Sequence, residues 1–307
     1  MTIKLKYLFL IILFVANNLF VTGQLNIDGR KYTFLFTEHF NNRVAICNDN
    51  GEIEWEFKCE HPQSAWLLPD GKRVLTSSKS KAMIIRIKDK KILWNYQVDS
   101  PNEIPYVQPI KHGHFVVGVE GKNTFYEFNK KGKLVNETKV DIYAQQVHGT
   151  FRFVQRTQRN TYIIPVTAEN QFREVDLNGT VIRKFRYTGN NAISALRLGN
   201  GNTILGPGAS GELVEVDKND SIVWKVSNND LSDCKINFVA GIYLLNNILF
   251  VANYGIHENA SKELPQFFAI DRNTGIVVWR AWSKDIGNVA QIQILDNKAN
   301  RRYNSKL

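Results

Sequence analysis

The residues of this chain most able to do chemistry are histidines and arginines that stand in predicted loops. Four of the six histidines flank apolar, strand-like runs, and two arginines follow one of those histidines closely. Imidazole can bind a metal, transfer a proton or act as a nucleophile, and guanidinium groups bind anionic oxygens. The candidate ligand-binding residues are His39, His61, His148, Arg152, Arg156 and His257.

The spacing of these residues does not indicate a particular reaction. No His-Glu-x-x-His, Cys-x-x-Cys or Gly-x-Ser-x-Gly motif is present, so the local signatures of zinc sites and serine nucleophiles are missing. We therefore predict no catalytic residue and no metal site. Divalent-metal binding by histidines from separate loops stays open as an alternative, because ligands can come from distant parts of a chain.

A repeated hairpin must position these residues. Its sharpest copy runs from Ala269 to Trp279, with a turn that contains Asp271 and Gly275 between two apolar runs. Aspartate and glycine suit tight turns, because glycine adopts the positive φ that such turns need. Aligned copies end at Trp55, Trp94, Asn136, Arg183 and Trp224. Most of the spacings are near the roughly 40 to 50 residues of a four-stranded propeller blade.

The order of the strands predicts an all-β fold, a single six-bladed β-propeller of four-stranded antiparallel blades. Residues 31–37, 43–48 and 52–58 supply strands B, C and D of a unit without a strand A, whereas 289–295 is a strand A with nothing after it. We expect these two ends to pair and close the ring, which removes exposed sheet edges. The other blades are predicted at 64–97, 106–139, 151–187, 193–226 and 238–282.

The N-terminus has the pattern of a secretory signal peptide. Lys4 and Lys6 precede an apolar run over 7–16, and small residues end at Gly23. The run is well below the roughly 18 residues of a spanning helix, which favours cleavage over a membrane anchor. We predict a signal peptide (1–23), a propeller domain (24–297) and a basic tail (298–307). The mature protein is then exported, periplasmic or secreted, without membrane insertion.

The net charge and the cysteine content limit the kinds of partner that the chain can bind and the disulfides that it can form. The formal net charge is +10, but six of these charges fall in the signal segment and the tail. The remaining lysines and arginines are scattered along the sequence, whereas nucleic-acid binders gather them on one element, so no nucleic-acid partner is expected. We expect a monomer. Three cysteines are an odd number, so at least one thiol has no partner within the chain.

The hairpin at Asp271-x-x-Thr274-Gly275-x-x-x-Trp279 resembles the tryptophan-docking motif of quinoprotein-like propellers, and the repeat is also similar to WD-repeat-like propellers. In the quinoprotein-like group the tryptophan packs between neighbouring blades, which the resemblance implies for Trp55, Trp94, Trp224 and Trp279. The members of that group that use pyrroloquinoline quinone are longer, eight-bladed chains with an adjacent Cys-Cys pair. This sequence has no such pair. We therefore expect no quinone or other cofactor.

Propeller geometry predicts where ligands bind. The D–A and B–C loops form one face, here called the long-loop face, and the A–B and C–D turns form the opposite, tight-turn face. His39, His61, His148 and His257 fall on the long-loop face, whereas His112 and His114 flank a tight turn. Long loops on a rigid scaffold commonly carry binding residues. We therefore predict an exported binding or scaffold protein that recognises a protein or glycan partner through this face.

An enzyme is the alternative function. The run from His61 to Leu75 is similar to the histidine-containing, Leu-Pro-Asp-Gly-bearing repeats of bacterial arylsulfotransferases, which are six-bladed exported propellers. That resemblance implies that one histidine acts as nucleophile while Arg152 or Arg156 stabilises the sulfuryl oxygens.

Overall fold

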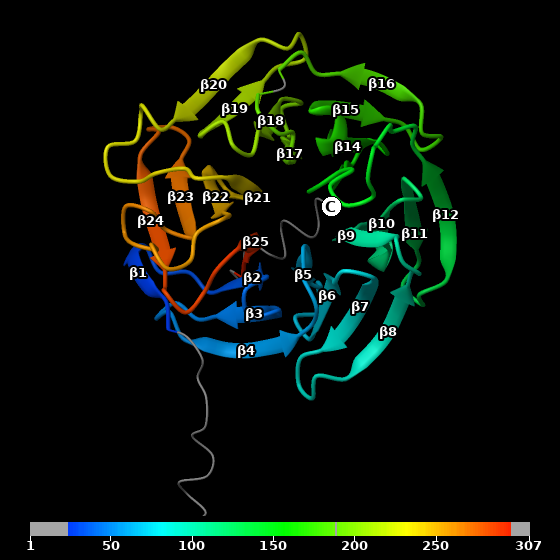
Figure 1. Cartoon of the computed structure of the whole chain (residues 1–307), viewed down its shortest axis with the longest axis horizontal. Coiled ribbons are helices and arrows are strands. Elements are labelled where there is room, and N and C mark those ends of the chain that lie inside the picture. The colour runs from blue at the N-terminus through cyan, green and yellow to red at the C-terminus, as the bar shows by residue number, and fades with distance from the viewer. Residues whose placement is uncertain (1–23, 188, 296–307) are drawn as a thin grey trace, which may run out of the picture.

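The computed structural model describes residues 24–187 and 189–295, which form six antiparallel sheets arranged in a ring around a central axis (Figure 1). The predicted signal segment and the basic tail lie outside the described residues. Within these residues, no helix is long and apolar enough to cross a membrane. The predicted six-bladed propeller of four-stranded antiparallel blades is confirmed, except that one blade carries a fifth strand.

The first blade combines strands from both ends of the chain, and the second and third hold consecutive strands. The first holds β25 (Val289–Ile294), β2 (Phe34–Glu38), β3 (Arg43–Cys47) and β4 (Ile53–Lys58). The second holds β5 (Ala65–Leu67), β6 (Arg73–Ser77), β7 (Lys81–Arg86) and β8 (Ile92–Gln97). The third holds β9 (Glu103–Pro109), β10 (Phe115–Glu120), β11 (Thr124–Phe128) and β12 (Leu134–Lys139).

The other three blades follow in chain order. The fourth holds β13 (Gln155–Arg156), β14 (Tyr162–Val166), β15 (Gln171–Val175) and β16 (Val181–Lys184). The fifth holds β17 (Ser194–Arg197), β18 (Thr203–Gly206), β19 (Glu212–Val216) and β20 (Ile222–Ser227). The sixth holds β21 (Val239–Leu245), β22 (Ile248–Asn253), β23 (Phe267–Asp271), β24 (Val277–Trp282) and β1 (Asn26–Gly29).

The ring is closed twice. β25 pairs with β2 in the register Phe34↔Ile294, so the predicted closure by the C-terminal strand A is confirmed. In addition, β1 pairs with β24 in the register Gly29↔Trp279 and lies on the outside of the sixth blade (Figure 1). The sequence analysis did not predict this strand, because Asn-Ile-Asp-Gly is short and has a single apolar residue.

Tryptophans dock the first blade on the second and the second on the third, as the resemblance implied. Nε1 of Trp55 donates a hydrogen bond to the carbonyl of Ile87 in the second blade at 3.1 Å. Nε1 of Trp94 donates to the carbonyl of Gly132 in the third blade at 3.2 Å. A buried aromatic ring contributes a large apolar area, and its N–H satisfies a carbonyl at the blade interface.

One of the two aligned positions without a tryptophan, Arg183, also docks its blade on the next. Arg183 ends the aligned unit of the fourth blade, and its Nη2 atom donates to the carbonyl of Asp217 in the fifth blade at 2.7 Å. In the sixth blade, the ring of Trp279 packs edge-on against Phe34 of the first blade, with centroids 5.4 Å apart. In the fourth blade, the Arg183 guanidinium thus makes the interblade hydrogen bond that an indole N–H makes in the first and second blades.

The innermost strands line the channel and are joined by glutamine side chains. Oε1 of Gln291 accepts a hydrogen bond from the backbone N–H of Ala65, at 3.2 Å, across the first and second blades. Oε1 of Gln108 accepts from the N–H of Arg156, at 2.9 Å, across the third and fourth. These bonds satisfy backbone groups that face the channel and fix neighbouring blades in register.

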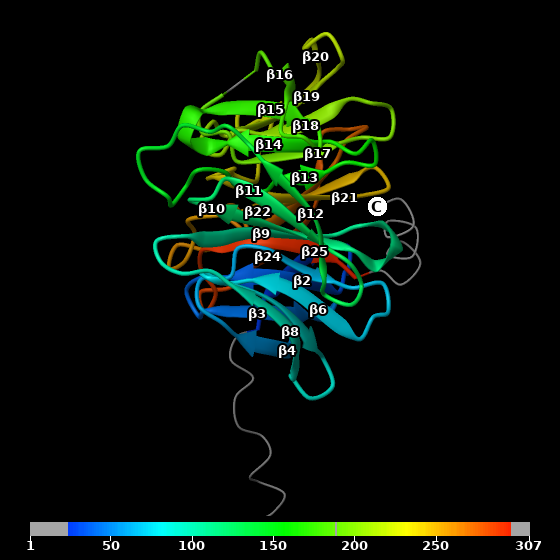
Figure 2. The same cartoon turned by 90° about the vertical axis from the view of Figure 1, so that its right-hand side faces the viewer.

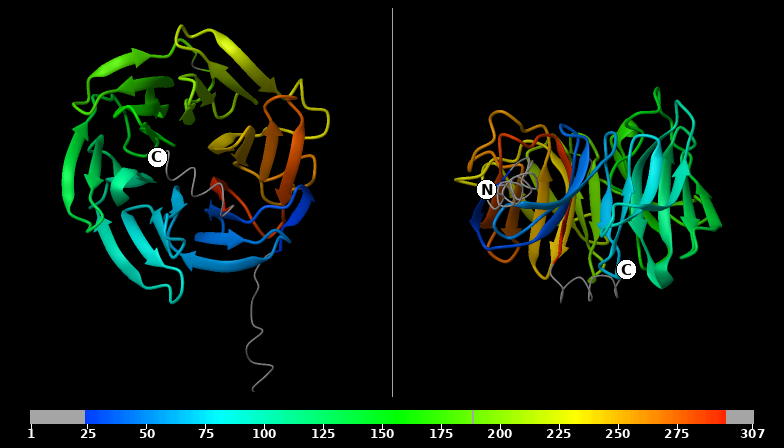
Figure 3. Two further views of the ribbon diagram at one scale, coloured as in Figure 1. Left: turned by 180° about the vertical axis from the view of Figure 1, so that it is seen from behind. Right: turned by 90° about the horizontal axis from the view of Figure 1, so that it is seen from below.

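The strands run from one face of the ring to the other (Figure 2). Because neighbouring strands within a blade are antiparallel, the A–B and C–D turns all lie on one face and the B–C and D–A loops on the opposite face. The view from behind shows the face of the ring opposite to that of Figure 1, and the view from below shows the ring from its edge (Figure 3). The long-loop face and the tight-turn face are thus separated by the length of a strand.

Candidate functional site

A pocket of about 380 Å³ opens on the long-loop face. Loops of five blades contribute to it, because the B–C and D–A loops converge around the channel. Its lining combines aromatic, cationic and acidic side chains with three of the predicted histidines. The lining residues are His39, Phe40, His61, Gln63, Lys79, Glu103, Ile104, Pro105, His148, Arg152, Tyr254 and Asn288.

A buried ion pair holds the loop that carries His39. Glu38 ends β2 and is fully buried, and its Oε2 atom accepts a hydrogen bond from Nε of Arg43 at 2.6 Å. Its Oε1 atom accepts from the backbone N–H of Gly287 at 3.0 Å. The backbone N–H of His39 donates to the carbonyl of Asn288 at 3.2 Å. The loops after β2 and before β25 are therefore fastened together below the pocket.

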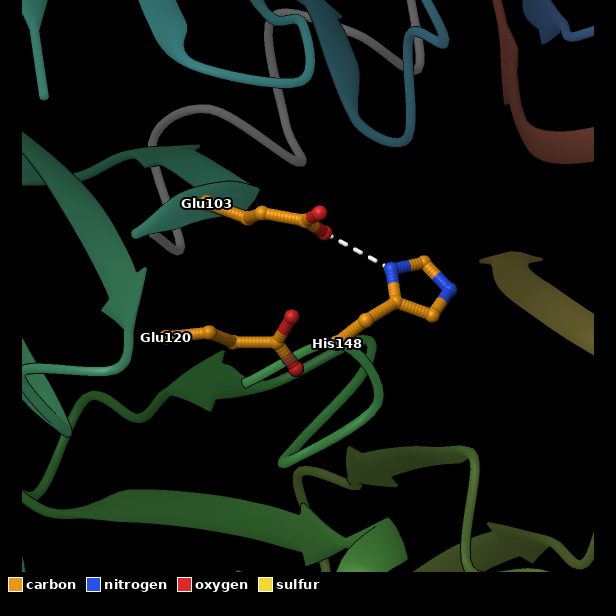
Figure 4. A group of neighbouring side chains, drawn as sticks. All are labelled: Glu103, Glu120 and His148. Carbon is orange, nitrogen blue, oxygen red and sulfur yellow. Dashed lines mark hydrogen bonds and ion pairs between the residues drawn. The ribbon is translucent and has the colours of Figure 1, made fainter. Parts of the chain in front are cut away.

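A chain of four polar side chains begins in one wall of the pocket and continues into the protein interior. Nδ1 of His148 lies 2.7 Å from Oε2 of Glu103, and Nε2 of His148 lies 3.2 Å from Nη2 of Arg152 (Figure 4 draws the histidine with both acids). Nη1 of Arg152 donates to Oε1 of Glu120 at 2.6 Å. Since the guanidinium is always a donor, Nε2 of His148 accepts and its Nδ1–H donates to Glu103.

The inner end of this wall is buried and the outer end is open. Glu120 has no exposed surface, whereas the side chain of His148 is 63% exposed. Burial raises the pKa of Glu120 above its usual value, although Arg152 and the backbone N–H groups of Phe151 and Gly149 oppose this effect. The Arg152 guanidinium thus compensates the buried carboxyl group of Glu120 at the inner end of the wall and presents a donor to the pocket.

His39 lies deeper in the pocket and is neutral at physiological pH. Burial, followed by the nearby His61 and Arg152, lowers the pKa of His39 to about 4. The hydroxyl of Tyr254 lies 3.4 Å from Nδ1 of His39, and the rings of His39 and His61 meet edge to face with centroids 5.6 Å apart. The pocket floor is therefore made of polar aromatic side chains.

His257 lies beside the pocket and is not part of its lining. Its ring packs on Phe40, with centroids 3.8 Å apart, and Phe40 is 53% exposed. The contact depends on Gly287, where a Cβ atom would come within 2.6 Å of Cδ2 of His257. Phe40, supported by the half-buried ring of His257, forms an exposed aromatic platform at the rim.

Arg156 is placed away from the other candidates. Its Nη1 atom donates to the carbonyl of Thr157 at 3.1 Å and its Nη2 atom to Oδ1 of Asn160 at 3.2 Å, both in the A–B turn of the fourth blade. Arg156 therefore lies toward the tight-turn face, away from Arg152. The physical reason is that Arg156 is the last residue of β13, directly before the A–B turn, so it lies at the tight-turn end of the strand.

Sequence reasoning grouped His39, His61, His148 and Arg152, and the structure places these four in one pocket. It missed Phe40, Gln63, Lys79 and Asn288 as lining residues. All four lie in B–C or D–A loops, so membership of those loops was the available signal. Their side-chain types are common in solvent-exposed loops, and nothing in the spacing distinguished them.

Three side chains of the wall have the donor types of a metal site. One ligand atom each of Glu103, Glu120 and His148 lie within 4.8 Å of one another (Figure 4). The guanidinium of Arg152, however, contacts both Glu120 and His148. It already supplies positive charge at this position, and a divalent cation next to it would be repelled. The donors therefore fit an arginine-centred network better than a metal.

Fold and pocket define the protein as a six-bladed β-propeller with a ligand-sized pocket on its long-loop face. The chain belongs to the family described as Mal s 1 allergenic protein-like, whose model matches residues 36–253. This match does not confirm the quinoprotein-like assignment, so that resemblance is limited to the propeller fold. No curated protein sequence matches the chain.

Several solved structures share the fold. A protein of unknown function from Bacteroides caccae is 25% identical, with a TM-score of 0.78, over 86% of this chain and 99% of its own. A catalytically inactive histidine-to-alanine variant of virginiamycin B lyase from Staphylococcus aureus, with quinupristin, is 11% identical, with a TM-score of 0.56, over 88% of this chain and 96% of its own.

The β-propeller domain of Cps50 (Swd1) from Myceliophteria thermophila is also similar. It is 9% identical, with a TM-score of 0.56, over 91% of this chain and 97% of its own. At 9% and 11% identity, the similarity of this domain and of the lyase variant to the chain concerns the fold alone. Function must therefore be argued from the pocket, since one fold hosts many activities.

Proposed function

We propose that this protein is a binding protein that recognises a protein or glycan partner through its long-loop face, with the pocket receiving one group of that partner. The observation that carries the proposal is the convergence of His39, His61, His148, Arg152 and Tyr254 around a space of about 380 Å³. Pockets of roughly 300 to 1,000 Å³ with a few convergent polar groups are typical ligand sites.

The rim supports a partner larger than a small molecule. Phe40 and His257 form an aromatic platform beside the opening, and Lys79 adds a charge there, with a side chain that is 52% exposed. Exposed aromatic side chains contribute strongly to recognition because they bury a large area at low entropic cost. A sugar ring or an apolar side chain of the partner would lie on this platform while polar groups enter the pocket.

Capture experiments test the proposal. Immobilised protein is exposed to a glycan array and to extracellular protein extracts, and the wild type is compared with Phe40→Ala/Lys79→Ala. Tyr143→Ala is the matched control, because Tyr143 is 75% exposed in another loop of the same face and does not line the pocket. We expect the double variant to lose the partner that the wild type and the control retain. Equal capture by all three would contradict the proposal.

The proposal includes export, which the N-terminal sequence pattern supports. If residues 1–23 are a signal peptide, the protein isolated from outside the cytoplasm begins at Gln24. Intact-mass analysis of protein from each cell fraction gives the answer. Recovery of the full-length chain from the cytoplasm alone would contradict export.

Sulfuryl transfer is the second candidate, and the contact between Glu103 and His148 is the observation that favours it. A carboxylate that orients an imidazole is a common arrangement for a nucleophile or a general base. In this structure Nε2 of His148 accepts from Arg152, so the lone pair that would attack is engaged. Turnover of an aryl sulfate by the wild type and its loss in His148→Ala would establish the enzyme; no turnover in the wild type would exclude it.

A further inference from the structure

Eight lysines gather on the tight-turn face of the second and third blades. They lie in or beside four turns, the A–B and C–D turns of each blade, and every one of them is exposed. In the sequence they are separated by runs of strand, which is why the charge appeared scattered. The eight residues, here called the lysine surface, are Lys72, Lys88, Lys90, Lys91, Lys111, Lys130, Lys131 and Lys133.

Contacts join the four turns into one surface. The backbone N–H of Ile87 donates to the carbonyl of Lys72 at 2.9 Å, which links the two turns of the second blade. Trp94 docks on the C–D turn of the third blade through the hydrogen bond described above. In the third blade a Cβ atom at Gly113 would lie 3.2 Å from Cβ of Lys130, so its two turns touch. The lysines therefore form one contiguous surface.

The positive charge of this surface is not compensated. Its two acidic side chains are taken by arginines: Asp70 pairs with Arg73 at 2.5 Å, and Asp89 pairs with Arg86 at 2.6 Å. Arg86 holds the pKa of Asp89 at about 2, so both charges of that pair persist at neutral pH. Among the described residues, no ion pair involves any of the eight lysines.

Turn chemistry does not require lysine at these positions. In the fourth, fifth and sixth blades the C–D turn starts with Asp176, Asp217 and Asp271, whose Oδ1 atoms accept backbone N–H bonds at 2.8 to 2.9 Å. Asn129 plays this part in the third blade, also at 2.9 Å. The fold thus explains Asn129 and the positive φ of Gly132, but it does not explain the lysines around them.

Apolar side chains border the lysines. Ile92 and Leu93 directly follow Lys91 and are 42% and 43% exposed, and Leu134 and Val135 follow Lys133 at 40% and 47%. Similar pairs open the outer strands of the fourth and fifth blades, so the apolar residues alone are not specific to this surface. The combination with uncompensated lysines occurs on the second and third blades.

We propose that the lysine surface attaches the protein to membranes that contain anionic lipids. Clustered lysines beside apolar side chains are the combination that binds such a surface, through attraction of the charges and shallow burial of the apolar groups. The eight cations without an acidic partner are all lysines, which act as compact point charges and lack the bidentate geometry by which arginine reads individual phosphates or sulfates. The surface therefore suits a broad, negatively charged plane.

This attachment complements the long-loop face and does not depend on it. The lysine surface lies on the tight-turn face, and the pocket opens on the opposite face of the ring. A protein held by the lysine surface would present the pocket away from the membrane. The membrane proposal and the partner proposal can therefore fail separately.

Vesicle co-sedimentation of the purified protein tests the proposal. Vesicles of phosphatidylcholine alone are compared with vesicles that also contain phosphatidylserine. The test variant is Lys90→Glu/Lys91→Glu/Lys130→Glu/Lys131→Glu, and the control, which makes the same change in net charge at exposed lysines elsewhere, is Lys122→Glu/Lys184→Glu/Lys218→Glu/Lys284→Glu. Thermal unfolding of each variant confirms that it is folded before binding is compared.

We expect the wild type and the control to bind the anionic vesicles and to be released at about 1 M salt, where charges are screened beyond about 3 Å. Each lysine near the surface is worth about a fivefold change in partition, so the test variant should bind at least about 100-fold more weakly. Equal binding by the two variants would overturn the proposal. Binding independent of phosphatidylserine, or retention on heparin or DNA without vesicle binding, would also overturn it.

Discussion

Nδ1 of His148 lies 2.7 Å from Oε2 of Glu103, although 45 residues separate them in the sequence. This contact and the donor Arg152 on the other side of the ring select the tautomer with the proton on Nδ1. The imidazole is thereby held in one orientation at the pocket wall, while most of its surface stays exposed and accessible to a partner. The wall is a preorganised binding element rather than a loose cluster of loop residues.

The first prediction concerns that tautomer. In Glu103→Ala the acceptor for Nδ1–H is removed, so the fraction of His148 in the Nε2-protonated form should rise, although Arg152 still favours an unprotonated Nε2. Ring ¹⁵N chemical shifts, measured at alkaline pH where imidazole is neutral, report the tautomer directly. An Nδ1–H tautomer that persists in Glu103→Ala would show that Glu103 does not control it.

The second prediction concerns the pH dependence that His39 imposes. Its pKa in the folded protein is about 4, below the value of 6.5 for the unfolded chain, so the unfolded chain takes up the proton first as the pH falls. The stability due to neutral His39 is complete above about pH 6.5 and is lost progressively down to about pH 4, up to about 3 kcal/mol. Denaturant unfolding of His39→Gln should lack this loss, whereas His112→Gln should retain it.

The third prediction concerns the buried pair of Arg152 and Glu120. Arg152→Met leaves the carboxyl group of Glu120 buried without its cation, which should lower the free energy of unfolding by about 3 to 5 kcal/mol. Arg152→Met/Glu120→Gln should regain much of this loss, because the amide carries no charge. If the single variant were as stable as the wild type, the carboxyl group would not depend on Arg152.

The fourth prediction concerns blade docking. Trp94→Phe keeps a ring between the second and third blades but removes the donor to the carbonyl of Gly132. The loss of this hydrogen bond should cost about 1 kcal/mol, and some packing is lost with it. Leu93→Ala, at an exposed neighbouring position, should cost less in the same denaturant titration. The reverse order would contradict the docking role.

The fifth prediction concerns β1. At Gly29, which has a φ of 88°, a Cβ atom would lie 2.3 Å from the carbonyl oxygen of Val278. Gly29→Ala should therefore detach β1 from β24 and increase hydrogen exchange at 26–29, while the ring stays closed by β25. Gly71→Ala is the control, because its φ is also positive but no atom lies within 4 Å of the added Cβ. Unchanged protection at 26–29 would show that β1 is not held by this pairing.

Much of the fold could be predicted because each copy of the repeat encodes its hairpin within a short stretch of sequence. Asp271 shows the reason: its Oδ1 atom accepts the N–H of Asn273 at 2.9 Å and its carbonyl accepts the N–H of Gly275 at 2.8 Å, so one turn encodes its own geometry. The partners of β1 could not be predicted in this way. Pairing of Gly29 with Trp279 depends on where the chain ends meet in three dimensions.

The candidate site could be predicted only in part. Loop topology was sufficient to bring His39, His61 and His148 to one face, because every B–C and D–A loop lies there. It could not show that Arg156 points toward the opposite face or that Lys79 joins the pocket, since both depend on side-chain direction within a short segment. The lysine surface was missed for a related reason: distances along the chain do not report distances between neighbouring blades.

The most direct test of the central claim is the affinity of the captured partner for the long-loop face, measured by isothermal titration with wild type, Phe40→Ala and Tyr143→Ala. Truncation of the exposed aromatic platform should weaken binding by about 1 to 2 kcal/mol, or roughly 5- to 30-fold, whereas Tyr143→Ala should leave it unchanged. Wild-type affinity in Phe40→Ala, or an equal loss in Tyr143→Ala, would contradict recognition through this pocket.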